Sequence, residues 1–304
     1  MAGKHSRNIF DFRKNVFVAH PNPQAKNCAS ISLPFKIIII FLITSLLLSL
    51  VVVGRVFLPS VLHKNMLRKA ASTFSTNQSQ AGLERLAQKN PDIKAWLKID
   101  ETSINYAVCQ KDDDSFYISH NQLGKKSRYG ALTLSSTDDI SRENGDKNIV
   151  IFGNNMKDGS MFGSLKEYRK LDFFKAHPLM KFYHNDAQEN YAVFSVMILS
   201  SLDDDATEFK PNKSYFSNEA EFNNWYNEAC ARSLINTTID VAYGDDILTL
   251  VTVAKDFDGA RLVVMAKKVD DWTAERIDTS NAGVNPKIKY PLIWYTKKGL
   301  PYPY

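Results

Sequence analysis

The chain has 304 residues, of which 44% are hydrophobic and 23% are charged, and its formal net charge is +5. A chain of this length and composition can bury a sizeable core in one or two domains, which excludes wholesale disorder. No stripe of Lys and Arg interleaved with aromatic side chains follows the N-terminal region, so the sequence also argues against nucleic-acid binding.

The N-terminal region is basic and leads into a long apolar run. Residues 1–34 are predicted to form a polar cytoplasmic tail, since the only acidic residue among the first 36 is Asp11. Residues 37–53 carry no charge and, at ~1.5 Å per residue, cover most of a ~30 Å hydrocarbon core. We therefore predict a single-pass transmembrane signal anchor over residues 35–56. The positive-inside rule places the N-terminus in the cytoplasm and the C-terminal domain outside the cell membrane.

A cleaved secretory signal is the alternative for this segment. Such signals have an apolar region of about 7–15 residues followed by a small-residue cleavage site. The run here is longer, and the GRVF that follows it at residues 54–57 has no such pattern. The sequence therefore favours an uncleaved anchor.

Residues 57–88 have the spacing of an extracellular helical stalk. Apolar residues recur three and four positions apart, at Leu58, Val61 and Leu62 and again at Leu83 and Leu86. A polar segment over residues 72–80 interrupts the pattern, which predicts a break between two helices.

Residues 89–269 are predicted to form one domain rich in short strands. The runs are bounded by turn residues, and their number predicts a sandwich or a barrel. They lie at residues 96–99, 104–109, 131–134, 149–152, 180–183, 191–199, 247–253 and 261–266. One helix interrupts them after Ser217 or Asn218, where acidic residues follow a capping side chain and Phe222, Trp225 and Ala229 share one face.

Residues 270–304 and the cysteines give weaker signals. The C-terminal extension is rich in Pro and Tyr, and we predict no regular structure for it. Cysteines occur at 28, 109 and 230, and their spacing matches no metal motif. A disulfide between Cys109 and Cys230 is conceivable, but the sequence favours two free thiols.

Several of these segments together resemble the class B sortase family, in order and with compatible spacing over about residues 88–269. They are NPDIKAWLKI at 90–99, YAVCQ at 106–110, YISH at 117–120, NMKDGSMFG at 155–163, DFFKAHP at 172–178, DILTL at 246–250 and DGARLVV at 258–264. The resemblance implies a mainly β fold with α additions, a closed eight-stranded barrel on the outer face of a Gram-positive membrane. It also implies transpeptidation, in which a Cys thiolate attacks a sorting motif while a His moves protons and an Arg stabilises the oxyanion.

Two of the three catalytic positions that the resemblance implies are replaced. Where the family reads Tyr-Gly-His-Asn-Met, this chain reads FGNNM at 152–156, so Asn154 stands at the His position. Where the family reads Thr-Leu-Ser-Thr-Cys, this chain reads TLVTV at 249–253, so Val253 stands at the Cys position. Only the Arg is retained, as Arg261. Valine has no nucleophilic atom and asparagine does not titrate near neutral pH, so we predict a sortase-like protein without sortase chemistry.

The candidate binding residues are Asn155, Thr252 and Arg261, at the same place in the family pattern. Arg261 is expected to bind a peptide carbonyl or carboxylate, and the alternative is an Arg held by Asp256 or Asp258. The asparagines either contact a ligand or stabilise the turn of the glycine-framed loop.

Other residues could rescue catalysis or bind a ligand, but each has a simpler interpretation. Cys109 is the candidate displaced nucleophile, and His120, His177 and His184 are candidate relocated bases. Acidic triplets at 112–114 and 203–205 could hold a cation, yet solvated loops explain them, and we predict no cofactor and no metal. The segment NPKIK at 285–289 resembles the Asn-Pro-x-Thr start of class B sorting signals, with Ile in place of Thr, and could occupy the groove as a pseudo-substrate.

The predicted function is therefore the binding or scaffolding of a sorting-signal peptide, a pilin or an active sortase, without turnover. Two alternatives stay open: an active transpeptidase or hydrolase with a displaced nucleophile, and a structural wall-associated domain with a closed groove.

Overall fold

A computed structural model describes residues 32–75, 80–140, 147–184, 187–202 and 209–304. Most of the predicted cytoplasmic tail, Cys28 and the acidic triplet at 203–205 lie outside these residues. The chain divides into two compact units, Met1–Leu58 and Pro59–Tyr304.

The first long helix, α1 (Leu33–Ser75), begins in the first unit and ends in the second. By length and composition it is the one helix in the described ranges that could cross a membrane. Its apolar side chains in the first unit are exposed, among them Phe41, Leu47 and Val52. A second helix, α2 (Gln80–Ala87), follows residues that the structure does not describe, at the place where the sequence predicts a break.

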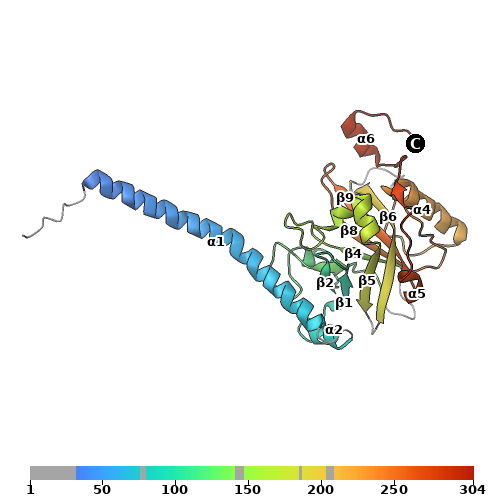
Figure 1. The fold of residues 1–304 in the computed structure, drawn as a ribbon, viewed down its shortest axis with the longest axis horizontal. Coiled ribbons are helices and arrows are strands. Elements are labelled where there is room, and N and C mark those ends of the chain that lie inside the picture. The colour runs from blue at the N-terminus through green and yellow to red at the C-terminus, as the bar shows by residue number, and fades with distance from the viewer. Residues whose placement is uncertain (1–31, 76–79, 141–146, 185–186, 203–208) are drawn as a thin grey trace, which may run out of the picture. The chain divides into compact units, whose positions relative to one another are not determined.

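Eight strands of the second unit close into a barrel in the order β1-β2-β3-β4-β8-β9-β6-β5 (Figure 1), which confirms the predicted fold class. The β2–β3 and β4–β8 pairs are parallel, and the other pairs are antiparallel. The strands are β1 (Ile93–Lys98), β2 (Asn105–Cys109), β3 (Leu132–Leu134), β4 (Asn148–Phe152), β5 (Leu179–His184), β6 (Ala187–Ser200), β8 (Ile247–Val253) and β9 (Ala260–Val269).

The barrel carries apolar side chains on both faces of its central strands. Leu250 and Val264 belong to the cluster inside the barrel, whereas their neighbours Val251 and Val263 belong to a second cluster. That second cluster includes α4 (Glu219–Arg232), which lies along β6. Strands covered on both faces read as continuous apolar runs, and this is why they were recognisable in the sequence.

Helix α4 has the face and the start that the sequence predicts. The side chain of Asn218 accepts a hydrogen bond from the backbone N–H of Glu221 at 2.9 Å, so Asn218 is the capping residue. Phe222, Trp225 and Ala229 are buried. The second unit also contains the short helical segments η1 (Phe116–Ile118), η2 (Leu165–Arg169) and α3 (Leu171–Ala176).

The last turns of α1 pack on the outside of β1 and β2. The ring of Phe74 stacks on Trp96 with centroids 4.5 Å apart. This cluster also contains Tyr117 and Cys109, and Cys109 has no exposed surface. The position of Cys109 on the face opposite Tyr106 and Val108 therefore agrees with the predicted alternation of the strand.

The C-terminal extension holds more regular structure than the sequence predicts. It forms α5 (Asp271–Ala274), β10 (Gly283–Val284) and α6 (Leu292–Lys298), and β10 pairs with β7 (Ile235–Asn236). Asn285 donates from its backbone N–H to Leu234 and from its side chain to the Ser233 carbonyl. Residues 285–289 thus lie beside the end of α4, and the pseudo-substrate hypothesis for them is wrong.

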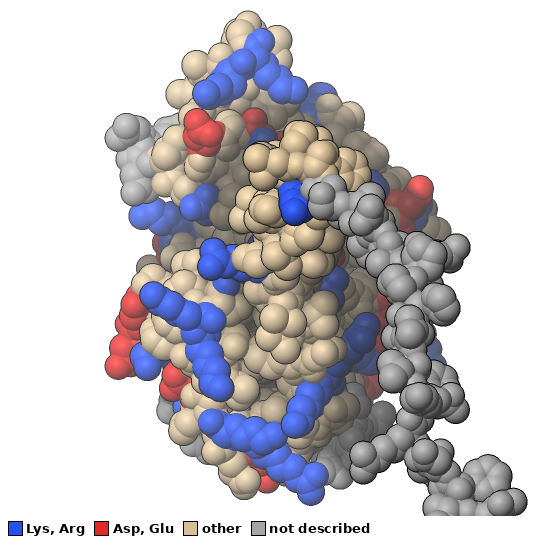
Figure 2. Space-filling model, turned by 90° about the vertical axis from the view of Figure 1, so that its left-hand side faces the viewer, with Lys and Arg blue, Asp and Glu red and all other residues tan. Residues whose placement is uncertain are grey.

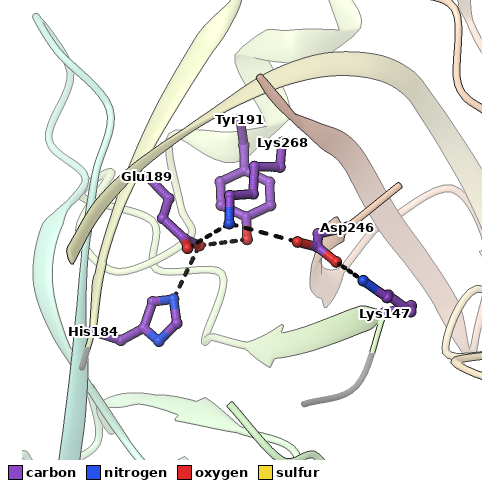
Figure 3. A network of polar contacts seen from close by, with 6 residues as sticks. All are labelled: Lys147, His184, Glu189, Tyr191, Asp246 and Lys268. Carbon is purple, nitrogen blue, oxygen red and sulfur yellow. Dashed lines mark hydrogen bonds and ion pairs between the residues drawn. The ribbon is translucent and has the colours of Figure 1, made fainter. Parts of the chain in front are cut away.

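One end of the barrel holds a network of charged and polar side chains (Figure 3). The Glu189 carboxylate accepts hydrogen bonds from Tyr191 at 3.0 Å and from Lys268 at 2.7 Å, and His184 Nε2 lies 3.0 Å from it. Lys268 also reaches Asp246, which pairs with Lys147 at 2.7 Å.

Candidate functional site

Strand pairing brings the three predicted catalytic positions together. Val253 ends β8, and its Cα pairs with that of Arg261 on β9. On the other side of β8, β4 runs parallel with Phe152 beside Val251, so the loop after β4 starts next to the end of β8. Asn154 is in that loop. Residues about a hundred positions apart therefore meet at one end of the barrel.

These residues line one open groove of about 360 Å³. The side chain of Val253 is half exposed, at 50%. The described residues of the lining include neither Cys nor His: Asp114, Ser115, Ile118, Ala131, Thr133, Phe152, Gly153, Asn154, Val251, Thr252, Val253 and Arg261. As candidate nucleophiles, this lining offers only the hydroxyls of Ser115, Thr133 and Thr252 and the one carboxylate of Asp114.

Asn154 uses its side chain within the protein. Its amide donates to the carbonyls of Ile118 at 2.8 Å and Tyr129 at 3.2 Å. Gly130, at φ +66°, allows the close approach, because a Cβ there would lie 2.8 Å from the Asn154 amide nitrogen. Asn154 thus ties its loop to the end of η1 and to the segment that follows η1, and does not stabilise the turn of its own loop as the alternative interpretation predicts.

The same loop is fastened to the end of β8. The Thr252 hydroxyl donates to the Gly153 carbonyl at 2.6 Å, and the Asn155 amide donates to the Val253 carbonyl at 2.8 Å. Thr252 is only 3% exposed. A side chain at Gly153 would collide with Leu132 and Phe162, each 2.6 Å from its Cβ, which explains the glycine at the start of the loop.

Arg261 is held by its own turn. Its Nη1 donates to the carbonyls of Gly259 at 3.3 Å and Ala260 at 3.1 Å. Asp256 instead forms a two-pronged contact with Arg169, at 2.8 and 3.1 Å. Among the described residues, neither Asp256 nor Asp258 pairs with Arg261, so that alternative is wrong. The guanidinium has five N–H donors, and those on Nε and Nη2 have no recorded partner in the described ranges.

The groove as described lacks the parts of a nucleophile–base pair. Val253 presents only carbon atoms, and the Asn154 amide cannot take up a proton near neutral pH. What the groove offers is a largely apolar wall with a few hydroxyls, the Asp114 carboxylate and the Arg261 guanidinium. The guanidinium suits an extended peptide that presents a carbonyl or carboxylate to it.

The candidates for a displaced catalytic group lie elsewhere. Burial raises the pKa of the Cys109 thiol well above its usual range, which disfavours the reactive thiolate. Cys109 and Cys230 are both free. His120 stacks on Phe116 and bonds its carbonyl, and His177 packs on Phe173. Neither cysteine and none of these histidines belongs to the described lining of the groove.

His184 belongs to the network at the other end of the barrel. Burial alone would raise the pKa of Glu189, but hydrogen bonds from His184, Lys268 and Tyr191 outweigh it and lower the pKa to about 2. Glu189 is only 8% exposed. Its carboxylate stays ionised near neutral pH because of these hydrogen bonds, in spite of its burial. The network is thus a structural cluster of paired charges, in which the Nδ1 atom of His184 is buried without a hydrogen-bond partner among the described residues.

No cation site emerges from the acidic triplet at 112–114. Asp113 accepts from the hydroxyl and N–H of Ser115, and Asp114 accepts from the N–H of Ser136 at 2.6 Å. Within the described ranges, no group of three His, Cys, Asp or Glu side chains could hold a metal ion.

Sequence reasoning missed part of the site. Asp114, Ser115 and Ala131 come to the groove because β3 pairs with β4 and β2, and no local pattern announces this. It also missed a second concavity of about 210 Å³ on the other side of Val253, which several basic residues line.

Comparison with known proteins gives a consistent result. Sortase B of Listeria monocytogenes is 31% identical over 204 residues, 66% of this chain and 80% of that protein. Sortase B of Staphylococcus aureus is 26% identical over 186 residues, 60% of this chain and 73% of that protein. No protein-family model matches the chain.

Solved structures agree on the fold. Sortase B of Bacillus anthracis in complex with AAEK1 has a TM-score of 0.61 and 28% identity, covering 71% of this chain and 100% of that one. A mutant form of Clostridium perfringens sortase B has a TM-score of 0.57 and 33% identity, covering 62% of this chain and 87% of that one. A Staphylococcus aureus sortase B–substrate complex has a TM-score of 0.63 at 23% identity, covering 70% of this chain and 99% of that one.

Proposed function

Because this chain belongs to the sortase B family, we propose that it is a catalytically degenerate member that holds a sorting-signal peptide without cleaving it. The observation that carries the proposal is the convergence of Asn154, Val253 and Arg261 on one open groove. Loss of the nucleophile removes turnover, whereas the shape that receives an extended peptide does not depend on it.

Arg261 is the residue proposed to orient the ligand. Its Nη1 is fixed by two backbone carbonyls, so the remaining donors are held in place at the groove edge. Preorganised donors bind at a lower entropic cost than free ones. A carbonyl or carboxylate of the peptide is the matching acceptor.

The arrangement along the chain is part of the proposal. Residues 1–34 would form the cytoplasmic tail, 35–56 the signal anchor, 57–88 the extracellular stalk, 89–269 the sortase-like domain and 270–304 the extension. Support for the anchor comes from the length and apolar composition of α1. A protein so placed could present a peptide, a pilin or an active sortase at the cell surface.

The binding assay uses the full chain in neutral detergent and a fluorescein-labelled peptide containing Asn-Pro-Ala-Thr. We expect saturable binding by fluorescence anisotropy, weakened about tenfold or more in Arg261→Ala, because hydrogen bonds to charged groups contribute ~1.5–3 kcal/mol. Val253→Trp should also weaken binding, since it fills the groove. No saturable binding, or binding indifferent to both variants, contradicts the proposal.

Arg276→Ala is the matched control. Arg276 also donates to a backbone carbonyl, that of Trp272 at 3.1 Å, but it lies in the C-terminal extension and not in the groove lining. Its replacement should leave the affinity unchanged.

A further inference from the structure

A second concavity adjoins the groove and has a different chemistry. It measures about 210 Å³ and shares Val253 with the groove. Its basic side chains come from three segments: Lys157 from the loop after β4, Lys166 and Arg169 from η2, and Lys255 from the turn between β8 and β9. We call it the basic pocket.

Three acidic residues around the basic pocket are already paired. Asp256 holds Arg169 at 2.8 Å. Glu167 lies 2.7 Å from Lys170, and Asp158 lies 3.5 Å from Lys64. Asp258 is nearby in sequence, but it is exposed and outside the described lining.

Three ammonium groups therefore remain without an acidic partner. Among the described residues, Lys157, Lys166 and Lys255 form no ion pair. Like charges that converge on one concavity repel one another, and an anion placed between them relieves that repulsion. The pocket thus favours a carboxylate or another anion.

We propose that the basic pocket receives acidic residues of the same peptide that occupies the groove, which makes the ligand an acidic peptide. The inference rests on the proposed function, because it takes the groove as the place of the peptide backbone. Val253 forms a wall of both concavities and is half exposed, so a ligand that crosses it is in reach of both. The groove then receives the peptide backbone, and the lysines of the basic pocket favour peptides with acidic side chains.

General attraction to basic surface is the competing explanation. Lys and Arg side chains are spread over much of the face in Figure 2, with acidic ones mainly toward its edges. A polyanion could bind such a surface without any pocket. The test must therefore separate the three pocket lysines from equally exposed ones.

The experiment compares four fluorescein-labelled peptides on the full chain in neutral detergent. Each contains Asn-Pro-Ala-Thr, with three Asp or three Asn residues added before or after it. We expect one of the two Asp peptides to bind about tenfold more tightly than its Asn counterpart at 0.05 M salt. The gain should shrink at 1 M salt, where the Debye length is about 3 Å.

Two triple variants locate the effect. Lys157→Gln with Lys166→Gln and Lys255→Gln should abolish the tenfold gain and leave the affinity for the Asn peptides unchanged. The control triple, Lys94→Gln with Lys125→Gln and Lys297→Gln, replaces exposed lysines outside both concavities and should keep the gain.

The outcomes separate this inference from the proposed function. If the Asn peptides bind and the Asp peptides gain nothing, or if the control triple loses the gain equally, the basic pocket does not select acidic residues while the groove proposal stands. If a glycerol-phosphate polymer competes more strongly than the Asp peptides through the same lysines, the ligand is a wall polymer and the acidic-peptide inference is overturned. If no peptide binds, both proposals fail.

Discussion

The two ends of the β8–β9 pair have opposite characters. At one end, Asp246 and Lys268 join His184, Glu189 and Tyr191 in a network of ionisable groups. At the other end, Val253 and Arg261 border a groove whose described lining has no acid–base pair of the catalytic kind. The ionisable residues at the network end thus pair with one another. The groove end is instead recognised by where its lining residues lie, at the opposite end of the two strands.

The largest expected effect is a gain in reactivity when a His and a Cys are introduced at the groove end. We expect the double variant Asn154→His with Val253→Cys to cleave a peptide that continues beyond Asn-Pro-Ala-Thr. The introduced thiolate would form a thioester with the Thr carbonyl, and the residues after Thr would leave as an amine. Because one member of such a unit contributes about 10²-fold or more in rate, the double variant should exceed each single variant by at least that factor. Intact-mass spectrometry measures the adduct. A double variant no more reactive than the wild type would mean that the groove cannot place a peptide against position 253.

At the network end, Glu189→Ala should destabilise the barrel strongly. The change leaves Lys268 and His184 without their shared acceptor in a site where Glu189 is 8% exposed. Breaking a buried pair costs about 3–5 kcal/mol, and because Lys268 is 40% exposed we expect a loss at the lower end, about 3 kcal/mol. Urea unfolding followed by Trp fluorescence gives the free energy, and a loss below about 1 kcal/mol would show that the network is dispensable.

The same carboxylate predicts how stability depends on pH. Its pKa is about 2 in the folded protein, below its ordinary value of 4.5, so its contribution is present above pH 4.5 and is lost as the pH falls toward 2. The free energy of unfolding should drop by roughly 2 kcal/mol over that range. In Glu189→Gln this part of the slope should vanish. An unchanged slope would assign the acid sensitivity to other groups.

The smallest effects belong to the groove end. Asn154→Ala removes two hydrogen bonds to backbone carbonyls and should cost about 1–2 kcal/mol in unfolding free energy. Val253→Ala serves as its control, since a half-exposed valine should cost less than about 1 kcal/mol. If Val253→Ala were the more destabilising change, position 253 would be part of the core.

The sequence predicts the barrel well because its strands are local patterns. Apolar runs such as Ile247–Val253 are buried on both faces, and all eight predicted runs lie on barrel strands. The extension was harder to predict. The pairing of β10 with β7 and the contacts of Asn285 with Leu234 depend on partners about fifty residues away.

The site was predictable only in part. Family resemblance pointed to Asn154, Val253 and Arg261, and the parallel pairing of β4 with β8 explains why they meet. Their internal hydrogen bonds could not be read from the sequence, because the partners of Asn154 are the carbonyls of Ile118 at the end of η1 and of Tyr129 after it, 36 and 25 residues away along the chain. The basic pocket was missed for the same reason, since its lysines come from three separate segments.

The central claim is that the groove binds a sorting-signal peptide and performs no chemistry on it. One sample tests this directly: the full chain with the Asn-Pro-Ala-Thr peptide and an oligoglycine amine, followed by anisotropy and intact-mass spectrometry together. We predict saturable binding, an unmodified protein and an intact peptide after prolonged incubation. A thioacyl adduct, a cleaved peptide or an oligoglycine conjugate would contradict the account.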